Sequence, residues 1–301
     1  MKFKLKPKSI AVIELTLYPN WYPGKVKSIG DTDKVRGNLA LQSINWGIKR
    51  GYRMVISDAG SSPTFQKELS KFSQIIFLKR QGETRAAGRR QGILAASVIK
   101  GVKVILRTEP EKVSIVKDCI PQISSPILRG KTDIVAPKRN PILFHQTYPK
   151  YMWQSEIAGN KNYNNLLHKF NLLPKNQSFD AFFGPIAFSN RPEILQLFLE
   201  KYTVIRHPFS KIGKYVNPEE WSNNYLFPVI KALYQGLKVM SKEINFRYPK
   251  EQKLNEETID NGSLSKFMTK RKEQRLGFIE ELICFIKYLH NDSKSGLKRI
   301  E

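Results

Sequence analysis

The chain has 301 residues, of which 41% are hydrophobic and 26% are charged, a balance typical of globular domains. Its charges are not balanced, because 51 lysines and arginines stand against 26 aspartates and glutamates, for a formal net charge of +25. Such a field favours phosphates, nucleic acid or an anionic membrane surface, without choosing among them. No run of 18 apolar residues occurs, so the sequence predicts no transmembrane helix.

The cysteines and the N-terminal segment indicate a reducing compartment. Cys119 and Cys284 are isolated, which argues against a zinc site and against a disulfide framework. The first residues, MKFKLKPKSIAVIELTLYP, are basic and then apolar, but the apolar run is short, contains Glu14 and reaches no small-residue cleavage site. A first β-strand is expected there. We predict a cytoplasmic protein, with peripheral contact at the anionic inner face of the membrane as an open alternative.

The first part of the chain alternates short apolar runs with helical patterns. Strands are expected at residues 9–17, 53–57, 73–78 and 103–106, and a further short strand at 133–136. Helices are expected at residues 32–49, 64–72, 85–100 and 112–120. Four strands alternating with three helices predict a mostly parallel, doubly wound α/β sheet with flanking helices.

The later part of the chain gives weaker patterns. Residues 140–180 carry many asparagines, lysines and aromatic residues and predict no clear element, and 180–189 is an apolar segment containing Gly-Pro. We expect helices at 192–202, 217–236 and 264–290, a strand at 239–246 and a polar linker at 255–263. The predicted organisation is an α/β half at 1–140, a second half of the same domain at 141–254 and a helical C-terminal extension at 255–301.

The stretch 52–62, YRMVISDAGSS, places an acid at the tip of a predicted buried strand and follows it with glycine and serine. Open α/β sheets bind ligands at the carboxyl ends of their strands, because backbone amides and polar side chains converge there. Asp58 is therefore a candidate to accept hydrogen bonds from a base or a ribose. In the alternative interpretation, Asp58, Ser61 or Ser62 caps the helix that follows, near Pro63.

Charged side chains also follow the next two predicted strands. Arg85, Arg89 and Arg90 fall on the first turns of a helix, where guanidinium groups and the helix N-terminus suit a diphosphate. The alternative is a solvated helix face. Glu109 and Glu111 follow the fourth strand, where two carboxylates can share a divalent cation or cap the next helix. One nucleotide-diphosphate ligand would span these strand ends in the order nucleoside, diphosphate, cation.

This order of motifs resembles the nucleotide-binding half of a GT-A glycosyltransferase, near glycosyltransferase family 2, over about residues 9–140. Elements similar to the family's own are LYPN at 17–20, DAGS at 58–61, GRRQGI at 88–93, EPE at 109–111 and DIV at 133–135 followed by Arg139. The EPE element stands where the family carries its metal-binding Asp-x-Asp. The resemblance implies a Rossmann-like GT-A fold, a UDP- or GDP-sugar donor and Mg²⁺ or Mn²⁺. The acceptor would be a sugar, a glycerate-like molecule or a lipid-linked molecule.

The second half is similar to the mannosylglycerate and glucosylglycerate synthase-like branch, through DAFFGP at 180–185, a later histidine and a long helix. That branch implies His207 as a further metal ligand, with a loop histidine as the alternative. Glu156 is the acid nearest to a place where an acceptor base is expected. If the enzyme inverts configuration, Glu156 would deprotonate the acceptor hydroxyl. A surface carboxylate is the alternative.

The sequence thus favours a glycosyltransferase and leaves two other classes open. A sugar nucleotidyltransferase would use a related sheet, but no Gly-x-Gly-Thr-Arg-like loop follows the first strand. A non-enzymatic nucleic-acid-binding protein would explain the basic charge, but the sequence carries no recognised motif for it, and no specific nucleic-acid partner is expected.

Overall fold

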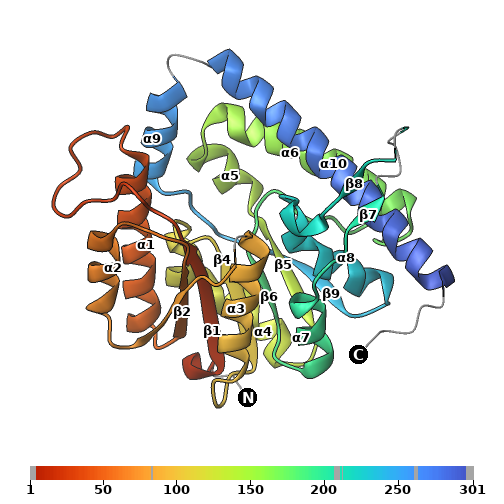
Figure 1. The fold of residues 1–301 in the computed structure, drawn as a ribbon, viewed down its shortest axis with the longest axis horizontal. Helices are drawn as coiled ribbons and strands as arrows, with labels where there is room; N and C mark the ends of the chain where they lie inside the picture. Colours follow the sequence, from red (N-terminus) through yellow and green to blue (C-terminus); the bar gives the residue numbers. More distant parts are fainter. Residues whose placement is uncertain (1–4, 83, 207–210, 212, 261–263, 296–301) are drawn as a thin grey trace.

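The computed structural model describes residues 5–82, 84–206, 211, 213–260 and 264–295. Among these residues, seven strands form one mixed sheet in the order β3-β2-β1-β4-β6-β5-β9 (Figure 1). Their bounds are β1 Ile10–Thr16, β2 Arg53–Asp58, β3 Ile75–Lys79, β4 Val104–Thr108, β5 Ile134–Arg139, β6 Ile186–Ser189 and β9 Val239–Ile244. Neighbouring strands run parallel except at β6, which is antiparallel to β4 and to β5.

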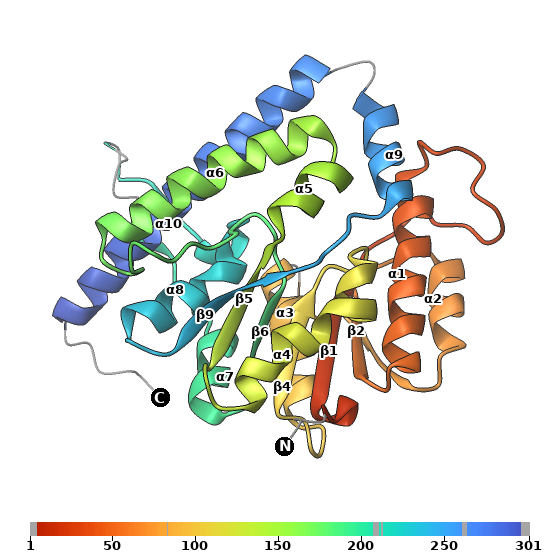
Figure 2. The same ribbon diagram turned by 180° about the vertical axis from the view of Figure 1, so that it is seen from behind.

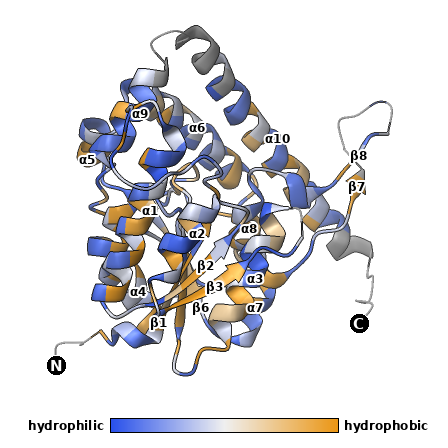
Figure 3. Ribbon diagram, turned by 60° about the vertical axis from the view of Figure 1, so that its left-hand side comes forward, coloured by the Kyte–Doolittle hydropathy of each residue, from blue (hydrophilic) through white to orange (hydrophobic). Residues whose placement is uncertain are grey.

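The buried residues of the interior strands are mostly apolar, because helices cover both faces of the sheet. In β1, Ile10 and Val12 face one hydrophobic cluster, whereas Ala11 and Ile13 face the other. This alternation follows from the two-residue period of a strand. Figure 3 shows the hydrophobic strands enclosed by helices whose outer faces are largely hydrophilic. The predicted α/β class, with a mostly parallel sheet and flanking helices, is confirmed.

The two clusters divide the helices between the two faces of the sheet (Figures 1 and 2). One face carries α3 Arg85–Ser97, α6 Lys150–Lys169, α7 Pro192–Leu199, α8 Phe227–Tyr234 and α10 Leu264–Ser295. The other face carries α1 Thr32–Lys49, α2 Pro63–Ser70, α4 Ile120–Leu128 and α5 Pro141–Thr147. A short hairpin, β7 Ile205–Arg206 with β8 Tyr215–Val216, projects from the body of the molecule (Figure 3).

α10 packs along α6 over much of its length (Figures 1 and 2). Its inner face buries Leu282, Phe285 and Ile286 against the cluster that also holds the core of α8. The helix is amphipathic, so one side of it meets solvent. In the described part of the chain, no helix combines the length and the apolar character that crossing a membrane requires.

Several predicted elements differ from the observed ones. The helix predicted at 112–120 is a π-helical segment, Ile115–Cys119, that continues into α4 and ends at Leu128. Residues 140–180, which gave no clear pattern, contain α5 and α6. Within the range predicted as one helix at 217–236, two 3₁₀ turns precede α8, namely Pro218–Glu220 and Asn224–Leu226.

The linker predicted at 255–263 is wrong over residues 255–260, which belong to α9, Lys250–Asp260. Residues 261–263 lie outside the described residues. Polar contacts hold this helix against α1 in place of an apolar stripe. Asn255 is fully buried and donates from Nδ2 to the Ile29 carbonyl at 2.6 Å. Glu256 forms an ion pair with Arg36 at 3.2 Å and accepts from the Tyr248 hydroxyl at 2.7 Å. The domain boundary predicted after residue 254 therefore falls inside a helix.

Candidate functional site

A cavity of about 500 Å³ lies at the carboxyl ends of the central strands. β1 supplies Leu15 and Thr16, and the segments after β2, β3 and β4 supply Ala59, Arg80 and residues 109–111. β1 lies between β2 and β4, so this is the point where the sheet reverses its winding, the usual place for a ligand in an open α/β sheet. We call it the switch-point cavity. Its volume is in the range of small-molecule sites.

The opposite wall comes from elements later in the chain. Glu156 reaches the switch-point cavity from α6, and Ser222 and Tyr225 reach it from the segment before α8. α10 contributes Arg271, Gln274 and Phe278. The cavity therefore depends on both the strand ends and the C-terminal helix.

The lining of the switch-point cavity carries more positive than negative charge. Among the described lining residues, six arginines stand against three glutamates, an excess of three positive charges by subtraction. The arginines are Arg36, Arg80, Arg85, Arg89, Arg107 and Arg271, and the glutamates are Glu109, Glu111 and Glu156. A concave site of one sign focuses its field, so this cavity favours an anionic ligand.

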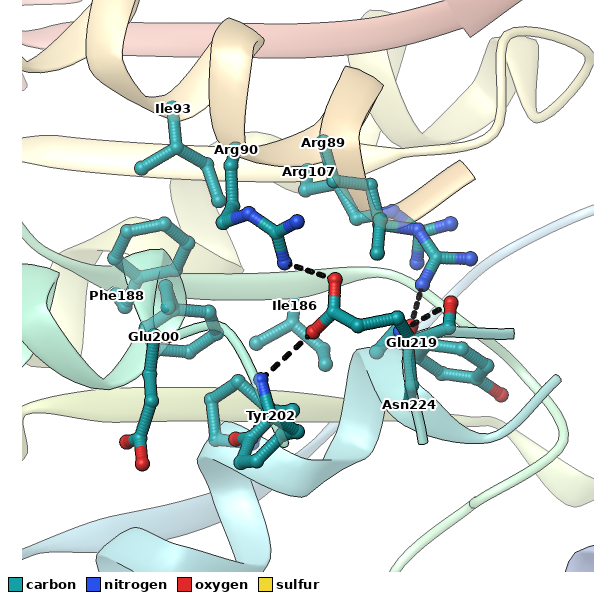
Figure 4. A pocket seen from close by; sticks show the side chains of 14 residues that line it. Arg89, Arg90, Ile93, Arg107, Ile186, Phe188, Glu200, Tyr202, Glu219 and Asn224 are labelled. Atoms are coloured by element: carbon teal, nitrogen blue, oxygen red, sulfur yellow. Dashed lines mark hydrogen bonds and ion pairs between the residues drawn. The ribbon is translucent and has the colours of Figure 1, made fainter. Parts of the chain in front are cut away.

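Arg89 and Arg107 form the centre of this charge. Their guanidinium carbons lie 5.6 and 5.0 Å from the centroid of the same ring, that of Tyr225. Arg89 donates to the Asn224 side chain through Nη1, and Figure 4 shows it next to Arg107. Burial, and then the charge of Arg107, lower the pKa of Arg89 to about 9. A bound anion would favour the charged form of both groups.

The other two predicted arginines of α3 point in different directions. Arg85 is exposed and lines the switch-point cavity. Arg90 points toward Glu219, with 2.5 Å between Nη1 and Oε2, and lines a separate cavity of about 40 Å³ (Figure 4). Glu219 also accepts from the backbone N–H of Tyr202 at 2.9 Å. Of the three, Arg85 and Arg89 share the cavity at the strand ends, whereas Arg90 ties α3 to the segment before α8.

Asp58 ends β2 and is 2% exposed, with its carboxylate directed into its own turn. Five donors from the described residues reach it at 2.5–3.1 Å. They are Thr16 Oγ1, Ser61 Oγ, the N–H groups of Gly60 and Ser61, and Gln66 Nε2. Ser62 caps α2, accepting from Phe65 N–H at 3.2 Å. Of the described residues in this turn, Ala59 lines the switch-point cavity. A nucleoside contact by Asp58 stays a prediction. The observed contacts show that Asp58 stabilises its own turn.

Replacing Asp58 with Ala is expected to lower the free energy of unfolding by about 2–4 kcal/mol, because several buried donors lose a charged acceptor at once. Urea unfolding measures this loss. Asp118→Ala is the control, because the Asp118 side chain is half exposed and its ion pair with Arg50 is long, at 3.7 Å. This substitution should lower the free energy of unfolding by less than about 1 kcal/mol. Equal costs for the two variants would contradict the structural task assigned to Asp58.

Glu109 follows β4 and is held by two cations. Its Oε2 lies 3.0 Å from Lys112 Nζ, and its Oε1 lies 3.6 Å from Arg107 Nη2. Burial alone would raise the pKa of Glu109, but Lys112 and Arg107 outweigh it and lower that pKa overall. Gly184, with φ of +97°, backs onto this carboxylate, and a Cβ there would clash with Oε1. Glu109 thus has two cations beside it, while its buried Oε2 has no hydrogen-bond partner within the described residues.

Glu111 accepts a hydrogen bond from the Tyr18 hydroxyl at 3.0 Å. Among the residues that the structure describes, no three histidine, cysteine, aspartate or glutamate side chains gather as a metal site. His207, the predicted third ligand, lies outside the described residues. Mg²⁺ and Mn²⁺ prefer several oxygen ligands free of competing cations. The donor set at Glu109 and Glu111, one ion-paired and one bonded to a phenol, does not fit such an ion.

A carboxyl that the sequence interpretation did not assign to the site lies inside β1. Glu14 is fully buried, accepts from Ser43 Oγ at 2.5 Å through one oxygen, and its Oε2 has no hydrogen-bond partner within the described residues. Burial raises the pKa of Glu14 to about 8, and the charge of Glu111 adds to the effect. Glu14 is therefore protonated in the folded protein at neutral pH.

Glu14 is expected to make the protein less stable as pH rises from about 4.5 to about 8. In that window the folded state keeps a proton that the unfolded state releases, so the free energy of unfolding falls with pH. Glu14→Gln copies the protonated form and should remove this slope. Urea unfolding of both proteins across the window measures it. Parallel pH profiles for the two proteins would contradict the assignment.

Glu156, on the opposite wall, is 5% exposed. Its Oε2 accepts from Arg139 Nη1 at 2.6 Å, and its Oε1 lies 3.9 Å from Arg271 Nη1. Burial raises the pKa of Glu156, although Arg139 and Arg271 act against the shift. A carboxylate with a raised pKa, fixed at a cavity wall, is suited to take up a proton from a bound hydroxyl.

Arg139 fixes Glu156 in place. It is 4% exposed and makes two bonds to Asp180, from Nη2 and from Nε, each at 2.6 Å. Its guanidinium carbon lies 3.6 Å from the ring centroid of Phe144. The sequence interpretation assigned no function to Arg139. It also did not name Arg107 as a candidate site residue, although Arg107 directly precedes Thr108 at the end of a predicted strand, where site residues are expected.

No protein-family model and no curated protein matches this chain. Solved structures do resemble it. One is a proposed nucleotide-diphospho-sugar transferase from Desulfovibrio desulfuricans G20, 12% identical, covering 91% of this chain and 98% of that one, with a TM-score of 0.41. Another is glucosyl-3-phosphoglycerate synthase from Mycobacterium tuberculosis with Mn²⁺, UDP and glucosyl-3-phosphoglycerate, 11% identical, covering 90% and 80%, with a TM-score of 0.45. The same synthase with Mg²⁺ and UDP gives the same identity, coverage and score.

Proposed function

We propose that the chain is a glycosyltransferase that moves a sugar from a UDP- or GDP-sugar to a hydroxyl acceptor. One observation carries the proposal, namely a cavity that has arginines at the strand ends on one side and the buried carboxylate of Glu156 on the other. Arginines suit the diphosphate of a donor, and a buried carboxylate suits an acceptor hydroxyl. The sequence resemblance at the same strand ends supports this assignment.

In the proposed reaction, the oxygen of the acceptor hydroxyl forms a bond to the anomeric carbon of the donor sugar. The bond from that carbon to the diphosphate oxygen breaks, and its electron pair leaves with the nucleoside diphosphate. If configuration inverts, the hydroxyl proton passes to Glu156. Arg89 and Arg107, already paired over Tyr225, would stabilise the charge that develops on the diphosphate.

The two walls of the switch-point cavity suggest where the two substrates bind. We place the diphosphate near Arg85 and Arg89, and the nucleoside near the turn that Asp58 shapes. The acceptor would lie against α10, beside Gln274 and Phe278, within reach of Glu156. Mg²⁺ or Mn²⁺ has no assigned step in this reaction, because the donor set at Glu109 and Glu111 does not fit it.

A thermal-shift screen of UDP- and GDP-sugars tests the proposal, since a ligand that binds only the folded state raises the apparent stability. We expect one nucleotide-sugar to raise Tm, and the same donor to be consumed once an acceptor is supplied. A nucleotidyltransferase would instead use a nucleoside triphosphate and release pyrophosphate. Binding of nucleic acid with a steep salt dependence, together with no response to nucleotide-sugars, would contradict the proposal.

A further inference from the structure

The negative charges at the end of β4 already have partners. Glu109 is held by Lys112 and by Arg107, at 3.0 and 3.6 Å, and Glu111 accepts from Tyr18. A divalent cation between the two carboxylates would compete with a lysine, an arginine and a phenol hydroxyl. The carboxylates act as counter-charges that position Arg107 and Lys112 rather than as a pair open to an ion.

The positive groups of the cavity keep unused donors. In the described part of the chain, Nε of Arg89 and Nε of Arg107 are buried without a hydrogen-bond partner. Arg107 uses Nη1 for the Gly184 carbonyl at 2.9 Å, and Arg89 uses Nη1 for Asn224. Both groups are fixed by these bonds and by Tyr225, so their remaining donors are oriented before a ligand arrives.

The first turn of α3 adds to the same place. Thr84 caps this helix by accepting from Ala87 N–H at 3.1 Å. Gly88 allows Arg80 to lie against the helix, because a Cβ at residue 88 would come within 3.0 Å of Arg80 Cδ. Arg80 and the exposed Arg85 both line the switch-point cavity. A helix N-terminus and several guanidinium groups thus meet beside the ends of β3 and β4, an arrangement suited to phosphate.

We infer that the switch-point cavity binds the diphosphate of its nucleotide through Arg85, Arg89 and Arg107 and does so without a divalent cation. The inference rests on the proposed function, and it replaces the metal that the sequence resemblance implies. The excess of three positive charges offsets the charge of the diphosphate directly. A guanidinium group offers paired donors to phosphate oxygens and keeps its charge, which is the task that a cation would otherwise perform on the leaving group.

The test is calorimetric titration of UDP, and then of GDP, into the full chain. One sample contains EDTA and the other contains Mn²⁺. We expect one of the two nucleotides to bind in both samples, with dissociation constants that agree within about twofold. Arg89→Gln should weaken that nucleotide by about tenfold or more, because it removes a charge-assisted contact. The affinity of the Arg89→Gln variant for the free nucleoside should equal that of the native protein.

Two further variants keep the test decisive. Arg85→Gln changes an exposed side chain of the same cavity, so it should fold and should also weaken the diphosphate selectively. Arg53→Gln is the matched control, because Arg53 is exposed at the amino end of β2, away from the strand tips, and it should leave the affinity unchanged. Equal weakening of nucleotide and nucleoside by Arg89→Gln would overturn the inference.

The outcomes separate the inference from the proposed function. Nucleotide binding that needs Mn²⁺ and disappears in EDTA would overturn the inference and leave the glycosyltransferase proposal standing. Absence of UDP and GDP binding in both samples would overturn the proposed function itself. Binding in EDTA that is weakened selectively for the nucleotide on removing the charge of Arg85 or Arg89 supports both.

Discussion

Replacing Glu156 with Gln is expected to lower kcat by about 10²–10⁴-fold while the affinity for the nucleotide stays within about twofold. Gln keeps the shape of the side chain and can still accept the bond from Arg139, but it cannot take a proton from the acceptor. Initial rates of transfer and calorimetric titration of UDP or GDP measure the two quantities. The variant separates the chemical step from donor binding, because Glu156 lies on the wall opposite Arg85, Arg89 and Arg107.

The pH dependence gives an independent check of Glu156. Burial raises the pKa of Glu156, so kcat/KM of the proposed reaction should rise with pH in the native protein as this carboxyl loses its proton. The Glu156→Gln variant should not show this rise of kcat/KM with pH. Glu193→Gln, which changes an exposed glutamate of α7, is the control and should leave both rate and profile unchanged. Full turnover in Glu156→Gln would exclude Glu156 as the base and would fit a reaction that retains configuration.

Replacing Arg139 with Ala is expected to lower the free energy of unfolding by about 3–5 kcal/mol, because it leaves two buried carboxylates, Asp180 and Glu156, without their shared cation. Urea unfolding measures the loss. Arg191→Ala breaks an ion pair of similar length, 2.5 Å to Asp133, but the Arg191 side chain is 52% exposed, so its cost should stay below about 1 kcal/mol.

The same network is expected to lose stability at low pH. Burial raises the pKa of Asp180, but Arg139 outweighs burial and lowers that pKa below its usual value. The part of the stability that depends on charged Asp180 is therefore present above the ordinary aspartate range and is lost as pH falls through the lowered pKa. Similar stability losses for Arg139→Ala and Arg191→Ala would show that the buried network does not stabilise the fold.

Local sequence patterns located most of the elements near the N-terminus. The helix predicted at 32–49 coincides with α1, because apolar residues recur along it and Gly51 follows its end. The apolar runs predicted the ends of β1, β2 and β4 to within a few residues. Apolar periodicity did not predict α9, because the buried residues of this helix, among them Asn255, are polar. Their partners in α1 and in the segment preceding it are more than 200 positions earlier in the chain.

The site was predictable in position and less so in detail. The structure brings Glu156, Arg85, Arg89, Glu109 and Glu111 to one cavity, as expected where strand ends converge, while their chemical roles stay predictions. The sequence does not tell whether a strand-end acid faces a ligand or its own turn, and Asp58 faces its turn. Nor does position on a helix show that the partner of Arg90 is Glu219, more than a hundred residues later.

α10 follows all seven strands of the main sheet in the sequence, yet it forms one wall of the switch-point cavity through Arg271, Gln274 and Phe278. During translation, earlier segments of a chain emerge before later ones. The arginine side of the cavity, supplied mainly by the first 107 residues, is therefore synthesised before its opposite wall. Arg89 and Arg107 gain their contacts with Asn224, Gly184 and Tyr225 only after those residues have been made, and the wall from α10 is made later still. The switch-point cavity is therefore enclosed only when a segment more than 150 residues after Arg107 has packed against the strand ends.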